Sequence, residues 1–208
     1  MDLGELEALA LSLYAELEVD PERPPNTVRL ARAWSIGVER RPLVATPAAL
    51  QRFAGKTTIV VRPTVAPEYL NFFVGHELGH VLLERAGYVG EDLEACCDYL
   101  GAALMLPRAA VRAAYQAEGL RAPRVLADSL MCTQTAAALR LGEVVGVPLA
   151  AVSPALVRVR GPDAFVWPDE ATIRSWAARA RPGLTKVKLT DQRGRVALVA
   201  DEDVSDVG

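Results

Sequence analysis

The stretch "NFFVGHELGHVLLERAGYVGEDLEACCDYLGAALMLP", Asn71–Pro107, contains both histidines of this 208-residue chain. His76 and His80 lie four residues apart, and a glutamate directly follows the first of them. Apolar residues between about positions 67 and 84 recur with helical spacing, so we expect a helix here. Four residues along a helix turn the chain by about 400°, which places both imidazoles on one face, one turn apart. The stretch therefore predicts a helix whose two imidazoles can bind one metal ion.

His76, Glu77 and His80 form the pattern H-E-x-x-H, in which two histidines bind zinc and the glutamate is the general base of a metalloprotease. Short patterns of this kind also recur by chance in helices that carry no site. Two histidines placed at random in a chain of this length would, however, fall four residues apart only about once in a hundred. We therefore predict that His76 and His80 bind Zn²⁺ and that Glu77 is catalytic.

A catalytic zinc ion needs a third protein ligand and one open position. Because the chain has no third histidine, that ligand must be a carboxylate or a thiolate. A second helix, expected from about Asp92 to Leu106, carries Glu94 and Asp98 four residues apart and hence on one face. We expect Glu94 to be the third ligand. Asp98 would accept a hydrogen bond from the free ring N–H of a zinc-binding histidine and so orient it.

Cys97 is the rival for the third position, because thiolate is a strong zinc ligand and position 97 lies only about 60° from Glu94 around a helix. The pair Cys96–Cys97 also reads as two small apolar residues that face a core. Glu91, at the edge of the preceding loop, is a weaker candidate. Gly79 lies inside the H-E-x-x-H helix, where glycine is unfavourable by about 1 kcal/mol relative to alanine. We expect it to allow a neighbouring strand or helix to approach closely.

The arrangement E-x-x-x-D after H-E-x-x-H resembles that of the thermolysin-like glutamate zincins. More specifically, "FFVGHELGHVLLE" followed by "EACCDYLGAALMLP" resembles the ImmA/IrrE family of bacterial metallopeptidases. The resemblance is close over roughly Thr57–Pro107, and looser over the N-terminal helices and the segment to about Gly146. It implies an α+β, zincin-like fold in which helices pack on a small sheet, and limited proteolysis of a partner transcriptional repressor.

The family's functional residues carry over by position onto this sequence. Its zinc ligands fall on His76, His80 and Glu94, and its catalytic glutamate falls on Glu77. The departures from the family pattern remove no ligand. They are Asp98 where asparagine is frequent, Leu100 where an aromatic residue is common, and Leu106 where methionine often precedes the proline.

Composition and charge indicate the cellular compartment of the protein and its electrostatic attraction to nucleic acid or membrane. The net charge of −3 and the pI near 5.5 give no overall attraction to nucleic acid or anionic membrane. The acidic N-terminus "MDLGELEALALSLYAELEVD" lacks the basic region and cleavage site of a signal peptide. Three cysteines, two of them adjacent, make no disulfide framework and fit a reducing compartment. We therefore expect a cytoplasmic protein without a membrane span.

In the first part of the chain we expect further helices over about Leu3–Leu17 and Asn26–Trp34. The β-branched run "TTIVV", Thr57–Val61, predicts a strand. If this strand lies at a sheet edge above the zinc, it could hold an extended peptide by backbone pairing. An ordinary inner strand of the core is the alternative.

After Pro107, "RAAVRAAYQAEG" predicts a helix, and two shorter helices separated near Met131–Thr133 suggest a helix-turn-helix-like pair. Several arginines make this segment locally basic, so DNA binding is conceivable. The second helix of the pair carries few side chains that could read base edges, however, which favours packing or repressor docking. Family members commonly have such a segment, so its presence does not decide between these roles.

The predicted organisation has three parts. Residues 1–115 form the zincin-like metallopeptidase domain, and residues 116–148 form the helix-turn-helix-like segment. Residues 149–208 form a small unit of a strand, a helix over "DEATIRSWAARA" and a hairpin of "TKVKLTD" and "RVALVAD", followed by an acidic tail, "DEDVSD", that we expect to be disordered.

Two functions of different classes follow. In the first, the protein is a zinc endopeptidase that clips a cytoplasmic repressor, and an additional donor must stabilise the developing oxyanion. Sequence does not choose that donor among five candidates, which are Tyr69, Tyr88, Tyr99, Arg62 and Arg85. In the second, the metal site is structural or vestigial and the protein is a DNA-binding or repressor-binding module. An intact H-E-x-x-H favours the first, because a purely structural site has no need of Glu77.

Overall fold

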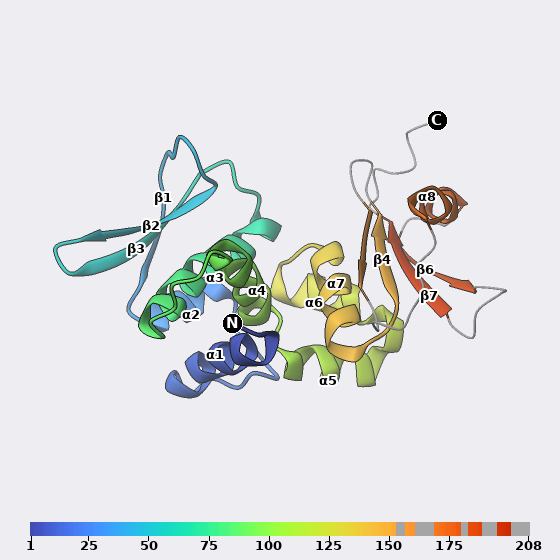
Figure 1. The fold of residues 1–208 in the computed structure, drawn as a ribbon, viewed down its shortest axis with the longest axis horizontal. Helices are drawn as coiled ribbons and strands as arrows, with labels where there is room; N and C mark the ends of the chain where they lie inside the picture. Colours follow the sequence, from blue (N-terminus) through green and yellow to red (C-terminus); the bar gives the residue numbers. More distant parts are fainter. Residues whose placement is uncertain (153–156, 161–168, 180–182, 189–194, 201–208) are drawn as a thin grey trace. The chain divides into compact units, whose positions relative to one another are not determined.

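A computed structural model describes residues 1–152, 157–160, 169–179, 183–188 and 195–200 of the chain (Figure 1). Two compact units can be separated. The first comprises Met1–Ala110 and Asp128–Cys132, and the second comprises Val111–Ala127 and Thr133–Gly208. The predicted three-part division, with boundaries after residues 115 and 148, stays a prediction.

The first unit contains α1 (Leu3–Glu16), α2 (Thr27–Ala33), β1 (Gly37–Arg40), β2 (Ala48–Phe53), β3 (Lys56–Val61), α3 (Pro67–Arg85) and α4 (Leu93–Met105). Local chemistry sets where these helices begin. Asp2 and Glu5 form a capping box at the start of α1, and the Asn26 side chain accepts a hydrogen bond from the backbone N–H of Arg29 in α2. Pro67 opens α3, where its missing N–H costs no helix hydrogen bond.

The sheet of the first unit has the strand order β1-β3-β2. β3 pairs in parallel with β1, with Gly37 opposite Thr58, and antiparallel with β2, with Leu50 opposite Ile59. The predicted strand at 57–61 is therefore confirmed as an inner strand, and the idea that it forms the edge for a peptide is wrong. Pairing on both sides satisfies its backbone groups, so the edge next to α3 belongs to β2.

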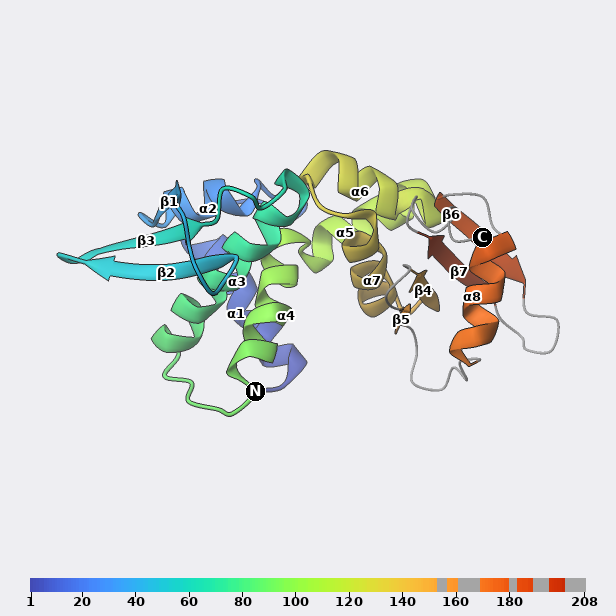
Figure 2. The ribbon, with the colours of Figure 1, turned by 90° about the horizontal axis from the view of Figure 1, so that it is seen from above.

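Helix α3 lies between the sheet and α4 in the first unit (Figures 1 and 2). Its inner face is apolar, and Val74, Leu78 and Leu83 are fully buried. The helix α1 packs on α4, where the buried Tyr14 hydroxyl donates a hydrogen bond of 2.6 Å to the carbonyl of Leu104. The predicted α+β class, with helices packed on a small sheet, is confirmed.

The chain then continues through α5 (Arg108–Glu118), a short 3₁₀ turn at Gly119–Arg121, α6 (Ala122–Leu130) and α7 (Gln134–Val145). The predicted pair of short helices separated near residues 131–133 is present. Thr133 begins α7, and its hydroxyl accepts a hydrogen bond of 3.1 Å from the backbone N–H of Ala136.

The second unit contains a four-stranded sheet in the order β5-β4-β7-β6. Besides α7 and parts of α5 and α6, the unit contains β4 (Leu149–Val152), β5 (Val157–Arg160), α8 (Glu170–Arg179), β6 (Gly183–Lys188) and β7 (Arg195–Ala200). The strands β6 and β7 pair antiparallel, with Val187 opposite Val196, as the predicted hairpin requires. The acidic tail "DEDVSD" lies outside the described residues. Within the described part of the chain, no helix has both the length and the apolar character needed to cross a membrane.

Candidate metal centre

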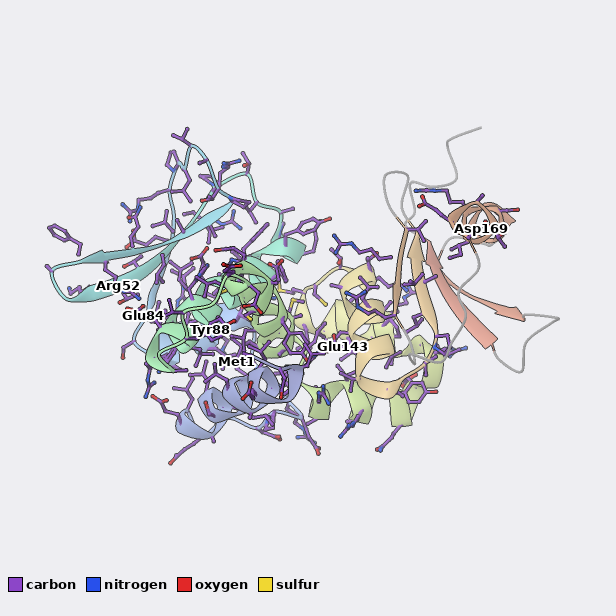
Figure 3. All side chains as sticks on the ribbon, viewed as in Figure 1. Met1, Arg52, Glu84, Tyr88, Glu143 and Asp169 are labelled. Carbon is purple, nitrogen blue, oxygen red and sulfur yellow. The ribbon has the colours of Figure 1, made fainter. Side chains whose placement is uncertain are left out.

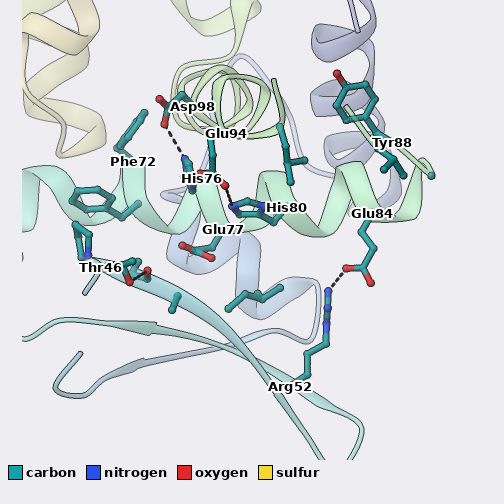
Figure 4. Close-up of a pocket in the computed structure, with 18 residues that line it drawn as sticks. Thr46, Arg52, Phe72, His76, Glu77, His80, Glu84, Tyr88, Glu94 and Asp98 are labelled. Atoms are coloured by element: carbon teal, nitrogen blue, oxygen red, sulfur yellow. Dashed lines mark hydrogen bonds and ion pairs between the residues drawn. The ribbon is translucent and has the colours of Figure 1, made fainter. Parts of the chain in front are cut away.

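The two histidines lie side by side on one face of α3, as their spacing predicts (Figure 4). The ring centroids of His76 and His80 are 5.0 Å apart. Their side chains are 16% and 25% exposed, so the rings are held in place by surrounding groups but remain accessible from one side. This half-buried position suits ligands that must be both ordered and reachable.

Glycines on both helices bring α4 against α3 at the level of the histidines. A Cβ atom on Gly75 would lie 2.9 Å from the carbonyl oxygen of Gly101, and one on Gly101 would lie 3.0 Å from the backbone nitrogen of His76. A Cβ on Gly79 would lie 3.2 Å from the Cα of Cys97. The predicted role of Gly79 in close approach is therefore confirmed, and the approaching element is a helix. This tight crossing places the acidic side chains of α4 beside the imidazoles.

Glu94 reaches both histidines from α4. Its Oε2 lies 3.3 Å from Nε2 of His76, and its Oε1 lies 3.6 Å from Nε2 of His80. Ligand atoms placed about 2.0–2.2 Å from a tetrahedral zinc ion lie roughly 3.4 Å from one another. Two imidazole nitrogens and a carboxylate at this spacing therefore fit a zinc ion.

Asp98, one turn along α4, contacts the other nitrogen of the first histidine. Its Oδ1 lies 2.9 Å from Nδ1 of His76, which leaves Nε2 directed toward Glu94 (Figure 4). A carboxylate on Nδ1 favours the tautomer with the proton on that nitrogen, and so keeps the lone pair of Nε2 for a metal. The contact is the one that the sequence spacing predicts.

Glu77 is oriented differently from the histidines of its own motif. Its side chain leaves α3 toward β2 and is only 7% exposed (Figure 4). Burial raises the pKa of Glu77, while the nearby His76 and His80 and a hydrogen bond from the backbone of Leu50 oppose this rise. A carboxylate with a raised pKa is a better proton acceptor at neutral pH than an exposed one.

The imidazoles and Glu77 line a pocket of about 760 Å³ between α3, α4, the loop that joins them, and β2. The residues that β2 and the segment before it contribute to the wall were not predicted from the sequence. The residue types in this segment are not typical of a functional site. Only the alternation of positions 48, 50 and 52 along an extended strand could have suggested that these side chains lie on one face of the strand. The lining residues outside the two motifs include Thr46, Pro47, Ala48, Ala49, Leu50, Arg52, Phe72, Phe73, Glu84, Tyr88, Val89 and Leu93.

The sequence of residues 31–152 matches the Peptidase_M78 family, described as the IrrE N-terminal-like domain. The chain belongs to this family. The matched residues include the whole of α3 and α4, so every side chain proposed for the metal centre lies within the IrrE-like region. Membership in a metallopeptidase family agrees with the resemblance seen in the motifs.

A solved structure of a Mycobacterium tuberculosis transcriptional regulator has the same fold. Its TM-score is 0.57 at 16% sequence identity, and the match covers 90% of this chain and 76% of the regulator. At this identity the likeness concerns the fold alone. No curated protein matches the chain significantly in sequence.

In this IrrE-like chain two side chains compete for the third ligand position. Besides Glu94, the buried Cys97 lies near the imidazoles, and ligand atoms of His76, His80 and Cys97 are all within 4.8 Å of one another. Burial, followed by the charge of Glu94, raises the pKa of the Cys97 thiol to about 12 in the metal-free chain. Glu94 offers carboxylate oxygens 3.3 and 3.6 Å from the two imidazole nitrogens, and we retain it as the proposed ligand. Glu91 is exposed and does not line the pocket.

Of the five candidate donors for an oxyanion, Tyr88 alone lines the pocket, and its hydroxyl donates to Asp92. The others are directed to different partners or positions. Tyr99 donates to Glu7, Arg85 pairs with Glu16, Arg62 donates to the carbonyl of Val44, and Tyr69 lies half-exposed outside the pocket. Within the described residues the structure thus identifies no ready oxyanion donor among the five.

Proposed function

We propose that this protein is a zinc-dependent endopeptidase that makes a limited, site-specific cut in a cytoplasmic protein, most simply a transcriptional repressor. The observation that carries the proposal is the position of Glu77. Its buried carboxylate faces the pocket from the same helix that presents the two imidazoles. A metal site that only stabilised the fold would need no carboxylate of this kind beside it.

His76, His80 and Glu94 would hold the metal, and Asp98 would fix the orientation of His76. A zinc ion held there would lower the pKa of water to about 7 and polarise the scissile carbonyl. Glu77 would take a proton from the attacking water onto its carboxylate and return it to the nitrogen of the leaving amine. This transfer splits the peptide bond into a carboxylate and an amine, with water as the second reactant.

The edge strand β2 would position the substrate. It pairs with β3 on one side, and its residues Ala48, Leu50 and Arg52 line the pocket. An extended peptide can add to such an edge by backbone hydrogen bonds, with alternate side chains entering the pocket. This geometry suits an unfolded or extended segment of a protein substrate rather than a compact surface.

A repressor is the proposed substrate because of the family resemblance, and the fold neighbour is itself named a transcriptional regulator. The test is co-expression with repressors encoded beside this protein, followed by mass spectrometry of the products. We expect one cut with the wild-type protein, and a rate at least about a hundredfold lower with Glu77→Gln. Glu68→Gln, an exposed position at the start of α3, is the matched control. A Glu77→Gln protein that still cuts at the wild-type rate would rule out the mechanism.

The alternative is a non-catalytic module that binds DNA or a repressor, and the α6–α7 pair and the regulator-like fold are its support. The burial of α7 argues against contacts between its side chains and the base edges of DNA. Each of its residues is buried or half-buried, and its arginine, Arg140, is 2% exposed and pairs with Glu143 at 2.7 Å. A recognition helix needs exposed polar side chains to reach base edges. Sequence-specific DNA retention by zinc-free protein would support the alternative nevertheless.

A further inference from the structure

The two ends of the pocket differ in chemistry. Near the start of α3 the wall is aromatic, with Phe72 and Phe73 in edge-to-face contact. Two turns beyond the level of His76, Glu84 extends from α3 and forms an ion pair with Arg52 of β2 (Figures 3 and 4). The ion pair thus crosses from the helix to the strand at one end of the pocket.

Glu84 is the pocket carboxylate that has no role in the proposed mechanism. The lining contains four carboxylates, those of Glu77, Glu84, Glu94 and Asp98, against one arginine, Arg52. Three of the four are occupied by proton transfer, metal binding or the hydrogen bond to His76. Even with a doubly charged zinc ion in place, the lining keeps a small negative excess when the histidines are neutral. The pocket as a whole therefore favours a cation over an anion.

The pair between Glu84 and Arg52 is open to exchange. The two side chains are 62% and 51% exposed, and ion pairs at such exposure contribute little to stability because water screens them. Glu84 belongs to a 19-residue helix that packs firmly on α4, whereas Arg52 lies on the exposed end of β2. The next residue, Arg85, is directed elsewhere and pairs with Glu16 at 2.9 Å. Arg52 is therefore the partner that a substrate can replace.

We infer that Glu84 is a specificity residue, which receives a lysine or arginine side chain of the substrate in place of Arg52. The inference rests on the proposed peptidase function, since it describes the same pocket. Arg52 acts as an internal competitor for Glu84, so it lowers the affinity of the pocket for basic substrates. Because it neutralises Glu84, it also weakens the repulsion that an unpaired Glu84 would exert on acidic substrates. The bound peptide would thus carry a basic residue on one side of the scissile bond.

The test measures binding, so that it does not depend on turnover. Phosphinic peptides bind zinc and extend on both sides of it, and they can carry lysine, norleucine or glutamate at one position on either side of the phosphinate. Calorimetric titration of the zinc-loaded full chain should show the lysine peptide binding roughly two- to fivefold tighter than the norleucine peptide, on one side only. The glutamate peptide should bind most weakly.

Variants separate Glu84 from general electrostatics. Glu84→Gln should remove the preference for lysine, Glu84→Lys should reverse it toward glutamate, and Arg52→Gln should increase it. Glu68→Gln, an equal loss of charge on α3 outside the pocket, should leave it unchanged. Equal affinity for the three peptides, or a lysine preference that survives Glu84→Gln, would overturn the inference while leaving the zinc site intact. If no phosphinic peptide binds, the zinc site itself fails and the inference falls with it.

Discussion

The Nδ1 atom of His76 lies 2.9 Å from the Oδ1 atom of Asp98, so a hydrogen bond joins α3 and α4 at the candidate metal centre. An amide oxygen can accept the same hydrogen bond without the charge. Asp98→Asn should therefore keep zinc with little loss, whereas Asp98→Ala should lower zinc affinity by about 10- to 100-fold. Competition with a chromogenic chelator measures both affinities.

The comparison between these two variants distinguishes orientation from charge. If Asp98→Asn loses as much affinity as Asp98→Ala, the negative charge on Asp98 matters more than the position it gives to His76. If neither variant loses affinity, the contact has no part in zinc binding. Asp98 is exposed, so neither change should destabilise the fold enough to confuse the result.

The choice between Glu94 and Cys97 can be made with cobalt in place of zinc. A thiolate ligand gives an intense sulfur-to-cobalt charge-transfer band in the near ultraviolet, and a carboxylate does not. We expect cobalt-substituted wild-type protein to lack this band. We also expect Glu94→Gln to lose most of its zinc, while Cys97→Ala keeps about one equivalent.

Two controls accompany this measurement. Glu91→Gln removes an exposed carboxylate three residues from Glu94, and should keep its zinc. Cys97 is fully buried, so Cys97→Ala needs a thermal unfolding curve to show that the chain remains folded. A charge-transfer band in the wild type that disappears in Cys97→Ala would make Cys97 the third ligand and remove Glu94 from that role.

The sequence predicts the parts of the site that a regular helix brings together. His76 and His80 share a face because of helical geometry alone, and the same rule places Glu94 beside Asp98. Sequence periodicity also predicts the helices around them. The strand β2 was not predicted, because "AALQRF" has neither the β-branched residues of a strong strand nor a clear alternation of apolar and polar residues.

Because β2 was not predicted, the contacts that depend on it could not be predicted either. The backbone of Leu50 faces Glu77 only because β2 pairs with β3 in a particular register, and such pairing depends on contacts between distant segments. The ion pair of Arg52 with Glu84 has the same origin, since its partners are 32 residues apart. The glycine crossing at Gly75 and Gly101 likewise becomes visible only when both helices are in place.

That crossing gives a third prediction. A Cβ on Gly101 would lie 3.0 Å from the nitrogen and 3.2 Å from the Cα of His76, and backbone atoms cannot rotate away as a side chain can. Gly101→Ala should push α4 from α3 and move Glu94 away from the imidazoles. Overpacking of this kind costs about 1–3 kcal/mol, against a gain of about 1 kcal/mol from the better helix propensity of alanine.

We expect Gly101→Ala to bind zinc more weakly and to unfold at lower denaturant concentration than the wild type. Chelator competition and urea unfolding measure the two effects. A variant that is more stable and binds zinc normally would mean that the helices can separate slightly without disturbing the site. The close crossing would then be a consequence of packing and would not position Glu94.

The buried carboxylate of Glu77 gives a prediction about pH and stability in the zinc-free protein. Burial raises the pKa of Glu77 in the folded chain above its value in the unfolded chain. The folded state therefore holds this proton more tightly, and its stability falls as pH rises from the unfolded pKa, about 4.3, through the folded value. Glutamine has a similar shape and no charge, so Glu77→Gln should be more stable than the wild type at neutral pH. The difference in the free energy of unfolding should shrink toward zero below about pH 4.

Urea unfolding of wild-type and Glu77→Gln protein across this pH range, in the presence of a chelator, measures this difference. A wild type more stable than Glu77→Gln at neutral pH would show that the Leu50 backbone and the imidazoles outweigh burial, and that Glu77 is held as a stabilised anion.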